Sequence, residues 1–273
     1  MIDLRLEKVN HEEASMRKRI FDFLAPHEAY CLFITGNLKQ SFPDSHIYIA
    51  RDGENWAGVA GYYGIPRSIV LFSFQQEVAR ALTRHVAERH PDITGLCAAA
   101  HLAEPGYEEL RRAGYELTDD PRCVFMQLDM QPPLQPFEEF VRMITAADFK
   151  TVRLLHQYLQ NLPQEPPVTD EELLLVGLNP TRVLAVDGEI VATASTNGMG
   201  ISAFQILGVV TKPEHRNKGY ARAVCGALIH SMWAEGSRQC ILFTQIDNIA
   251  AQACYKKLGF RIVGEYWVAR FKH

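Results

Sequence analysis

The sequence lacks the marks of several common protein classes. Its 273 residues contain no apolar run that approaches the roughly 18 residues of a membrane span. The first residues, M-I-D-L-R-L-E-K-V-N-H-E-E, carry acidic side chains where a secretory signal peptide needs an apolar segment. The glycine-rich loops G-x-x-x-x-G-K-[S/T] and G-x-G-x-x-G are absent as well. We therefore expect no contact with a membrane and no nucleotide site of either of these two kinds.

The cysteines and the net charge exclude further classes. None of the six cysteines belongs to a C-x-x-C pair or lies near a histidine at the spacing of a metal site. Several lie in apolar runs, where a free thiol behaves as a small hydrophobic side chain. The net charge of −4 and the pI near 6.2 disfavour a general binder of nucleic acid or of membrane surfaces. These features predict a cytoplasmic, reduced protein that holds no metal.

The chain is long enough for two domains, each with a core of its own. Residues 130–137, M-Q-P-P-L-Q-P-F, contain three prolines and no charge. Because proline fixes φ and lacks an N–H donor, this segment is typical of a stiff, extended linker. The sequence thus predicts a first domain over residues 1–130, a linker over 131–137 and a second domain over 138–273.

The two halves repeat one pattern of elements. In the first half the spacing predicts two helices, a hairpin, a strand, a helix, a strand, a short helix and a strand, at residues 11–40, 46–64, 68–72, 77–89, 93–99, 107–113 and 123–128. Its hairpin sequence I-A-R-D-G-E-N-W-A-G-V-A aligns with L-A-V-D-G-E-I-V-A-T-A-S around Asp187-Gly188. Further on, Y-E-E-L-R-R-A-G-Y-E aligns with A-C-Y-K-K-L-G-F-R. We infer two copies of one α/β domain, of which the first lacks the loop of residues 211–219.

The loop that only the second half contains has the features of an anion site. Residues 206–210 predict a buried strand, and apolar side chains recur at helical spacing over residues 221–233. A strand, a short polar loop and a helix aim free N–H groups and the positive end of the helix dipole at one point. Gly219 lacks a Cβ and would let a phosphate approach the main chain. Between Lys212 and Arg222 there are four Lys or Arg against one Glu. This stretch therefore predicts a phosphate cradle.

A second group of polar residues follows the cradle. Residues 240–246 predict a buried strand, and residues 249–258 predict a short helix. Asn248 and Tyr255 are seven residues apart, which places them on one face of that helix. The alternatives are an asparagine that only caps the helix and a tyrosine that only packs in the core.

Two motifs resemble those of the GNAT N-acetyltransferases. R-N-K-G-Y-A at residues 216–221 is similar to that family's [R/Q]-x-x-G-x-[G/A] loop, and N-I-A-A-Q-A-C-Y-K-K-L-G-F follows at residues 248–260. The resemblance covers residues 138–273. It implies an α/β fold with a mixed α+β sheet, built as two GNAT-type domains in tandem, each a mostly antiparallel twisted sheet flanked by helices. The first copy lacks the loop and has Leu110 in the place of Tyr255, so we expect it to do no chemistry and to help shape the acceptor pocket.

The resemblance implies acetyl-CoA as co-substrate and gives each residue a role. Residues 209–211 would lie where their strand separates from the strand at residues 240–246, and their backbone would hydrogen-bond the pantetheine arm. The N–H groups of residues 217–222 would bind the pyrophosphate. Asn248 would also contact the pantetheine arm. Tyr255 would be the general acid that protonates the departing thiolate. The implied CoA-binding residues are Val209, Val210, Thr211, Arg216, Asn217, Lys218, Gly219, Tyr220, Ala221, Arg222 and Asn248.

The function implied by this resemblance is direct transfer of an acetyl group, in a ternary complex, to a primary amine of a small molecule or a peptide. Cys254 is expected to face away from the reacting groups, so no cysteine intermediate is needed. The alternatives are a non-catalytic acyl-CoA-binding sensor and a transferase of a longer acyl group. A homodimer stays open. No acid lies on the strand before the loop, and Glu189, Thr196 and Gln205 are the weak candidates for the general base.

Overall fold

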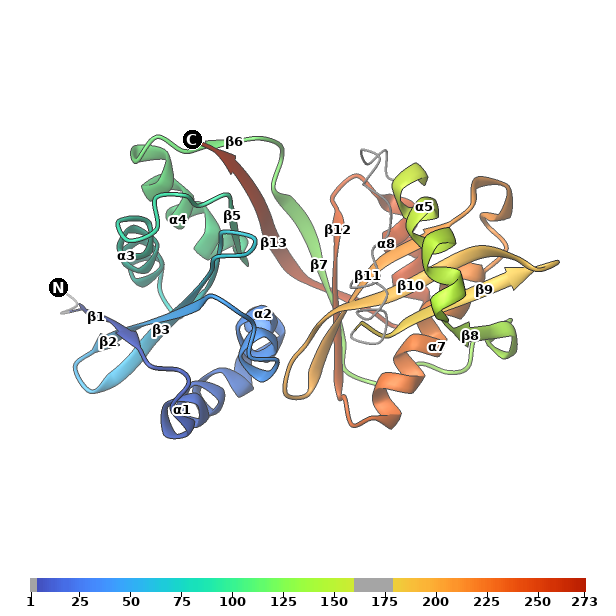
Figure 1. Cartoon of the computed structure of the whole chain (residues 1–273), viewed down its shortest axis with the longest axis horizontal. Coiled ribbons are helices and arrows are strands. Elements are labelled where there is room, and N and C mark those ends of the chain that lie inside the picture. Colours follow the sequence, from blue (N-terminus) through green and yellow to red (C-terminus); the bar gives the residue numbers. More distant parts are fainter. Residues whose placement is uncertain (1–3, 160–178) are drawn as a thin grey trace.

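A computed structural model describes residues 4–159 and 179–273 of the chain (Figure 1). The sequence also predicts a proline-rich loop at residues 162–168, which by its place in the family fold we expect beside the acceptor, and a helix that opens with the S/T-x-x-E spacing of a capping box at Thr169. Both lie outside the described residues. In the part of the chain that the structure describes, no helix is long and apolar enough to cross a membrane.

The first half follows the predicted order of elements, with a break between its first two helices next to Pro26. It adds strand β1, whose alternating sequence L-R-L-E-K-V pairs with the first strand of the hairpin. Its elements are β1 (Leu4–Val9), α1 (Ala14–Leu24), η1 (Ala25–His27), α2 (Glu28–Lys39), β2 (Ser45–Asp52), β3 (Asn55–Tyr63), β4 (Ser68–Ser73), α3 (Gln76–Ala87), β5 (Gly95–Ala99), α4 (Ala100–Arg112), β6 (Glu116–Leu117) and β7 (Arg122–Leu128).

The second half also follows its predicted order. Its hairpin turns at Asp187 and Gly188, which both have positive φ, as a tight two-residue turn requires. Its elements are η2 (Glu138–Phe140), β8 (Val141–Met143), η3 (Ala146–Asp148), α5 (Phe149–Leu159), β9 (Thr181–Val186), β10 (Glu189–Met199), β11 (Ala203–Thr211), η5 (Pro213–His215), α7 (Tyr220–Ala234), β12 (Gln239–Gln245), α8 (Ile249–Lys257) and β13 (Arg261–Lys272).

Within the described residues, thirteen strands form one mixed sheet that runs through both halves (Figure 1). The strand order is β1-β2-β3-β4-β5-β13-β7-β12-β11-β10-β9-β8, and β6 pairs with β13 beside this path. Neighbours are antiparallel except for two parallel pairs, β4 with β5 and β11 with β12. The predicted fold class, a mostly antiparallel sheet flanked by helices, is therefore confirmed.

The two halves exchange their last strands. Strand β7 ends the first half but pairs with β12 of the second half, where Cys123 lies opposite Gln245. Strand β13 ends the second half but pairs with β5 of the first half, where Tyr266 lies opposite Ala99. The two exchanged strands also pair with each other at the centre of the sheet. The division of the sequence at residues 131–137 remains our proposal for the boundary between the copies, each of which completes the sheet of the other.

The internal repeat is visible in the order of elements. The series β2-β3-β4-α3-β5-α4 in the first half matches β9-β10-β11-α7-β12-α8 in the second. Only Phe74 and Gln75 separate β4 from α3, whereas residues 212–219 separate β11 from α7. The loop that the sequence assigns to the second copy alone is therefore confirmed.

Apolar side chains pack helices on both faces of the sheet. In the first half, α3 and α4 bury Leu82 and Leu102 in one core, and α1 and α2 cover the opposite face with a core that includes Ile20. In the second half, α7 buries Leu228 against Leu242 of β12, and α5 lies on the other side of β10 and β11 (Figure 1). A layer of helices therefore covers each side of the strands that carry the site.

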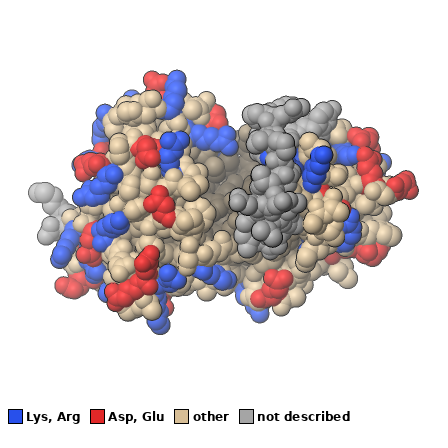
Figure 2. Space-filling model, in the orientation of Figure 1, with Lys and Arg blue, Asp and Glu red and all other residues tan. Residues whose placement is uncertain are grey.

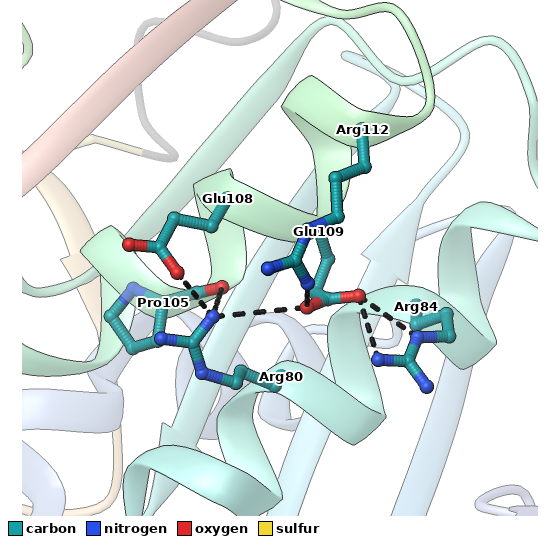
Figure 3. Close-up of polar contacts among 6 residues, drawn as sticks. All are labelled: Arg80, Arg84, Pro105, Glu108, Glu109 and Arg112. Atoms are coloured by element: carbon teal, nitrogen blue, oxygen red, sulfur yellow. Dashed lines mark hydrogen bonds and ion pairs between the residues drawn. The ribbon is translucent and has the colours of Figure 1, made fainter.

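Two groups of charged side chains join these elements. In the first half, the buried carboxylate of Glu109 on α4 pairs with Arg84 of α3 at 2.8 Å and with Arg112, and Arg80 of α3 pairs with Glu108 (Figure 3). This network fastens α3 to α4.

The second group joins the two halves through Glu28, the first residue of α2. The Glu28 carboxylate is buried and accepts hydrogen bonds from the N–H groups of Ile201, Ser202 (2.9 Å) and Ala203 (3.1 Å). These donors form the turn between β10 and β11, so α2 of the first half is held against the strand that carries the predicted site.

Candidate functional site

Strands β11 and β12 separate in the middle of the second half. They pair over three residue pairs, the last of which joins Gln205 to Ile241. Beyond that pair β11 continues to Thr211, without β12 beside it. The predicted separation of the two strands is confirmed, and it leaves one backbone edge of residues 209–211 open toward α8.

A cavity of about 710 Å³ lies between the end of β11, the loop before α7, and α8. Of the residues implied by the sequence, all but Lys218 line it: Val209, Val210, Thr211, Arg216, Asn217, Gly219, Tyr220, Ala221, Arg222, Asn248 and Tyr255. Further lining residues are His215, Ala250, Ala251, Ala253, Cys254 and Lys257. Two stretches that are about thirty residues apart in sequence thus meet around one space.

The loop before α7 points backbone donors into this cavity. Asn217 and Gly219 both have positive φ, +63° and +93°, and successive N–H groups in such a conformation form a concave anion site. Within the described residues, the N–H groups of residues 217–221 donate to no backbone carbonyl. The N–H of Arg222 donates to the Gly219 carbonyl at 3.0 Å, so the cradle has one donor fewer than the sequence implied. The N-terminus of the 15-residue helix α7 adds its dipole.

The positive charge of the loop is divided between the cavity and the surface. Arg216 and Arg222 line the cavity, whereas Lys212 forms an ion pair with Glu189 on the β9–β10 hairpin. Figure 2 shows basic and acidic side chains interspersed on the visible face of both halves, without an extended patch of one sign. The positive charge beside the cavity therefore comes from the loop, and the visible face adds no extended basic patch to it.

Helix α8 contributes Asn248 and Tyr255 to the same cavity. The side chain of Asn248 caps the helix by accepting a hydrogen bond from the Ala251 N–H at 3.1 Å. Tyr255 is 8% exposed and packs edge-to-face against Phe260. Burial raises the pKa of Tyr255 well above its ordinary value, so its hydroxyl keeps its proton at neutral pH.

The prediction that Cys254 faces away from the reacting groups is wrong. Cys254 lines the cavity next to Tyr255. Burial raises the pKa of the Cys254 thiol, so this group is a neutral thiol at pH 7 and a poor nucleophile.

The three residues considered as a general base do not line the cavity. Glu189 lies on the hairpin, away from the cavity lining, in its ion pair with Lys212. Thr196 is buried, with a hydroxyl that has no hydrogen-bond partner within the described residues. Gln205 accepts a hydrogen bond from Asn197 at 2.9 Å. None of these side chains presents an ionisable group to the cavity.

The structure shows a titratable group beside the site that the sequence analysis missed. The Nε2 atom of His156, on α5, forms a hydrogen bond with the Thr193 hydroxyl on β10, at a distance of 2.7 Å. Its ring covers Gly208 of β11, because a Cβ built on Gly208 would lie 2.6 Å from His156 Cε1. A single histidine on a predicted helix carries no signal for this contact, since its partners lie 37 and 52 residues further along the chain.

The first copy has no equivalent site. Leu110, at the position that corresponds to Tyr255, is fully buried in the core below α3 and α4. The two-residue connection between β4 and α3 leaves no loop to hold an anion. Within its described residues, the first copy therefore offers neither the loop nor the tyrosine that meet in the second copy.

Comparison with protein families identifies the class of protein domain that contains this cavity. Residues 151–260 match the family described as Acetyltransferase (GNAT) family, and this segment contains both motifs and the whole lining of the cavity. Residues 151–260 therefore form a GNAT acetyltransferase domain, and the proteins of this family transfer an acyl group from an acyl-CoA. No curated protein matches the chain in sequence.

Solved structures resemble the chain over its full length. A Drosophila protein is 16% identical with a TM-score of 0.70, over 97% of this chain and 98% of that one. A GCN5-related N-acetyltransferase from Sphaerobacter thermophilus is 16% identical, with a TM-score of 0.60 over 98% and 95%. A tandem GNAT protein from the clavulanic acid biosynthesis pathway is 16% identical, with a TM-score of 0.57 over 99% and 98%. At this identity the likeness shows the fold, which is the tandem GNAT arrangement.

Proposed function

We propose that the second half of the chain transfers an acetyl group from acetyl-CoA to a primary amine by direct transfer in a ternary complex. One observation carries this proposal: a single cavity collects the open edge of β11, the cradle of N–H groups before α7 and the hydroxyl of Tyr255. An extended pantetheine arm, a pyrophosphate and a leaving thiolate require these three kinds of group. The Thr211 hydroxyl, buried without a partner in the described part of the chain, is a further polar atom that such a ligand would satisfy.

Each group has a defined task in this reaction. The N–H groups of residues 217–221, with Arg216 and Arg222, bind the pyrophosphate. The backbone of residues 209–211 orients the pantetheine arm and donates a hydrogen bond to the thioester oxygen, on which negative charge develops during attack. Tyr255 holds its proton until the C–S bond breaks and then donates it to sulfur.

The environment of Cys254 favours direct transfer over a two-step route. A cysteine that carried the acyl group would have to attack as a thiolate. Burial raises the pKa of Cys254, which disfavours that form, and Tyr255 is the neighbouring group that can serve the departing sulfur. The amine therefore attacks while the acyl donor is still bound.

The test of transfer measures thiol release from acetyl-CoA with a panel of primary amines: an amino acid, an arylalkylamine, a polyamine and a peptide N-terminus. We expect at least one amine to support turnover, and Tyr255→Phe to lower kcat by about 10²- to 10⁴-fold, the usual contribution of a general acid. Tyr115→Phe is the matched control, because its hydroxyl donates to the Pro91 carbonyl in the first copy. Turnover equal to wild type in Tyr255→Phe would remove Tyr255 from this role.

The test of binding uses calorimetry with acetyl-CoA and the substitution Gly219→Glu. A carboxylate in the cradle would occupy the place of the pyrophosphate and repel it, so we expect binding to be lost. Gly236→Glu is the matched control, since Gly236 also has a positive φ (+103°), lies at the other end of α7 and has open space around it. Retained binding in Gly219→Glu would contradict the assignment of the cradle. Binding by the wild type without thiol release would identify a sensor instead of an enzyme.

A further inference from the structure

The contact between His156 and Gly208 places an imidazole at the point where β11 leaves β12. Gly208 immediately precedes Val209, the first residue of β11 that lines the cavity. It has a φ of +62°, and the register of β11 with β10 shifts between Thr193 and Ser195. The main chain is thus bulged toward α5 at this residue. The ring of His156 covers the bulge, and the helix that carries it, α5, lies on the face of the sheet opposite α7 and α8 (Figure 1).

The hydrogen bonds around Thr193 are compatible with a tautomer of His156 that leaves Nδ1 without a proton. The Thr193 hydroxyl has one proton, and it donates to the Gly208 carbonyl at 3.1 Å. We assign the hydroxyl proton to this contact, so that the same oxygen accepts from His156 Nε2 at 2.7 Å and Nε2 carries the proton of a neutral imidazole. The free lone pair is then on Nδ1. In the described part of the chain, no side chain or carbonyl forms a hydrogen bond with Nδ1.

The surroundings of His156 keep the imidazole neutral. Burial lowers its pKa from the ordinary value of 6.5. Helix α5 packs against η3, β10 and β11, and the residues on these elements that carry a charge at neutral pH are Asp148, Lys150, Arg153 and Glu189. Asp148 is held by Arg142 and Glu189 by Lys212. None of them contributes to the shift of His156, which is therefore an unprotonated base at pH 7.

We propose that His156 is the general base of the acetyl transfer, with Nδ1 as the atom that receives the proton of the amine, and that Thr193 is its positioning residue. This inference rests on the proposed function. As the bond between the amine nitrogen and the acetyl carbon forms, the amine proton passes to Nδ1 and the C–S bond breaks. The sulfur receives the proton of Tyr255. The imidazolium then loses its proton to solvent, and the phenolate of Tyr255 regains one, so that protons balance over the cycle.

The alternative role for His156 is packing against Gly208. A packing residue would affect stability and would leave the pH dependence of turnover unchanged. The two roles are therefore separated by a variant that keeps the shape and the Nε2–H donor but has no basic atom.

His156→Gln meets this requirement, because the glutamine amide nitrogen can take the place of Nε2 as donor to Thr193. With the amine that the wild type turns over fastest, we expect kcat to fall by about 10²- to 10⁴-fold at pH 7, while the melting temperature and the acetyl-CoA affinity stay at wild-type values. Thr193→Val removes the acceptor and should lower kcat by a smaller factor. Thr193→Ser keeps the hydroxyl and should retain turnover.

The wild type provides a measurement that needs no variant. An imidazolium cannot accept a proton, so kcat should decrease as the pH falls through a value below 6.5, and this limb should be absent from the profile of His156→Gln. A wild-type kcat without such a limb, or turnover of His156→Gln within threefold of wild type with the same profile, would overturn the role of His156 and leave the transfer function standing. Binding of acetyl-CoA without thiol release by the wild type would reject the transfer function, and the base with it.

Discussion

The carboxylate of Glu28 offers the sharpest test of how the two copies are joined. Glu28 is 4% exposed and belongs to α2 of the first copy, yet three of its donors are backbone N–H groups of residues 201–203 in the second. It also accepts from the Thr35 hydroxyl at 3.1 Å. The substitution Glu28→Ala removes the acceptor and leaves the donors of the turn between β10 and β11 unpaired.

The expected loss of stability follows from these unpaired donors. A buried donor without a partner costs about 1–3 kcal/mol. Ile201 is 45% exposed, so water can reach this turn in part, and the lower end of the range applies to each of the three N–H groups. The free energy of unfolding should then decrease by about 3 kcal/mol, which corresponds to a decrease in melting temperature of about 6–12 °C at roughly 2–4 °C per kcal/mol.

Thermal unfolding followed by circular dichroism measures this change. Glu54→Ala is the matched control, because Glu54 is exposed in the turn between β2 and β3 and should change the stability by less than about 0.5 kcal/mol. Glu28→Gln keeps the shape but turns an amide N–H₂ toward some of the donors, so its melting temperature should lie between those of the wild type and Glu28→Ala. A melting temperature of Glu28→Ala within 2 °C of wild type, roughly the effect of less than 1 kcal/mol, would refute the reasoning.

Three further predictions concern the site. Gly208→Ala should lower kcat because its Cβ would push the imidazole on α5 aside; Gly53→Ala, at a similar φ of +58° and in open space, should carry the same backbone cost and keep full turnover in the thiol-release assay. Cys254→Ala should change kcat by less than about twofold, or 0.4 kcal/mol, whereas loss of turnover would indicate a covalent route. Arg222→Ala should weaken acetyl-CoA binding in calorimetry by about tenfold or more, from the loss of a charge-assisted contact of about 1.5 kcal/mol, and Lys212→Ala, whose ammonium pairs outside the cavity, should not.

The local features of the fold were predictable because they depend on residues close in sequence. The Asp-Gly turns located both hairpins, and the alignment of the copies located the additional loop before α7. The separation of β11 from β12 and the shared face of Asn248 and Tyr255 followed from spacing and from the family resemblance. The alternating stretch of β1 has the period of a strand and could have been found by the same rule.

Features that depend on distant residues were not predictable. Helix α4 begins at Ala100 and continues past Pro105, which is buried in it, although proline in a sequence indicates a helix boundary; packing against α3 outweighs the local preference. The contact of His156 with Gly208 depends on a bulge in a strand of another part of the chain. Likewise, the apolar patterns of β7 and β13 fit a central position in either copy, so they do not determine which neighbour each strand takes.

The exchange of β7 and β13 makes the peptide connection between the copies redundant for holding them together. If the backbone were cut within residues 131–137, β7 would still lie between β12 and β13, and β13 would still pair with β5. Neither fragment could leave without breaking the ladders of main-chain hydrogen bonds that join β7 to β12, β7 to β13 and β5 to β13, and without exposing strand edges that favour aggregation. The copies therefore form one interlocked frame, in which the hydrogen bonds of Glu28 hold α2 of the first copy against the turn between β10 and β11.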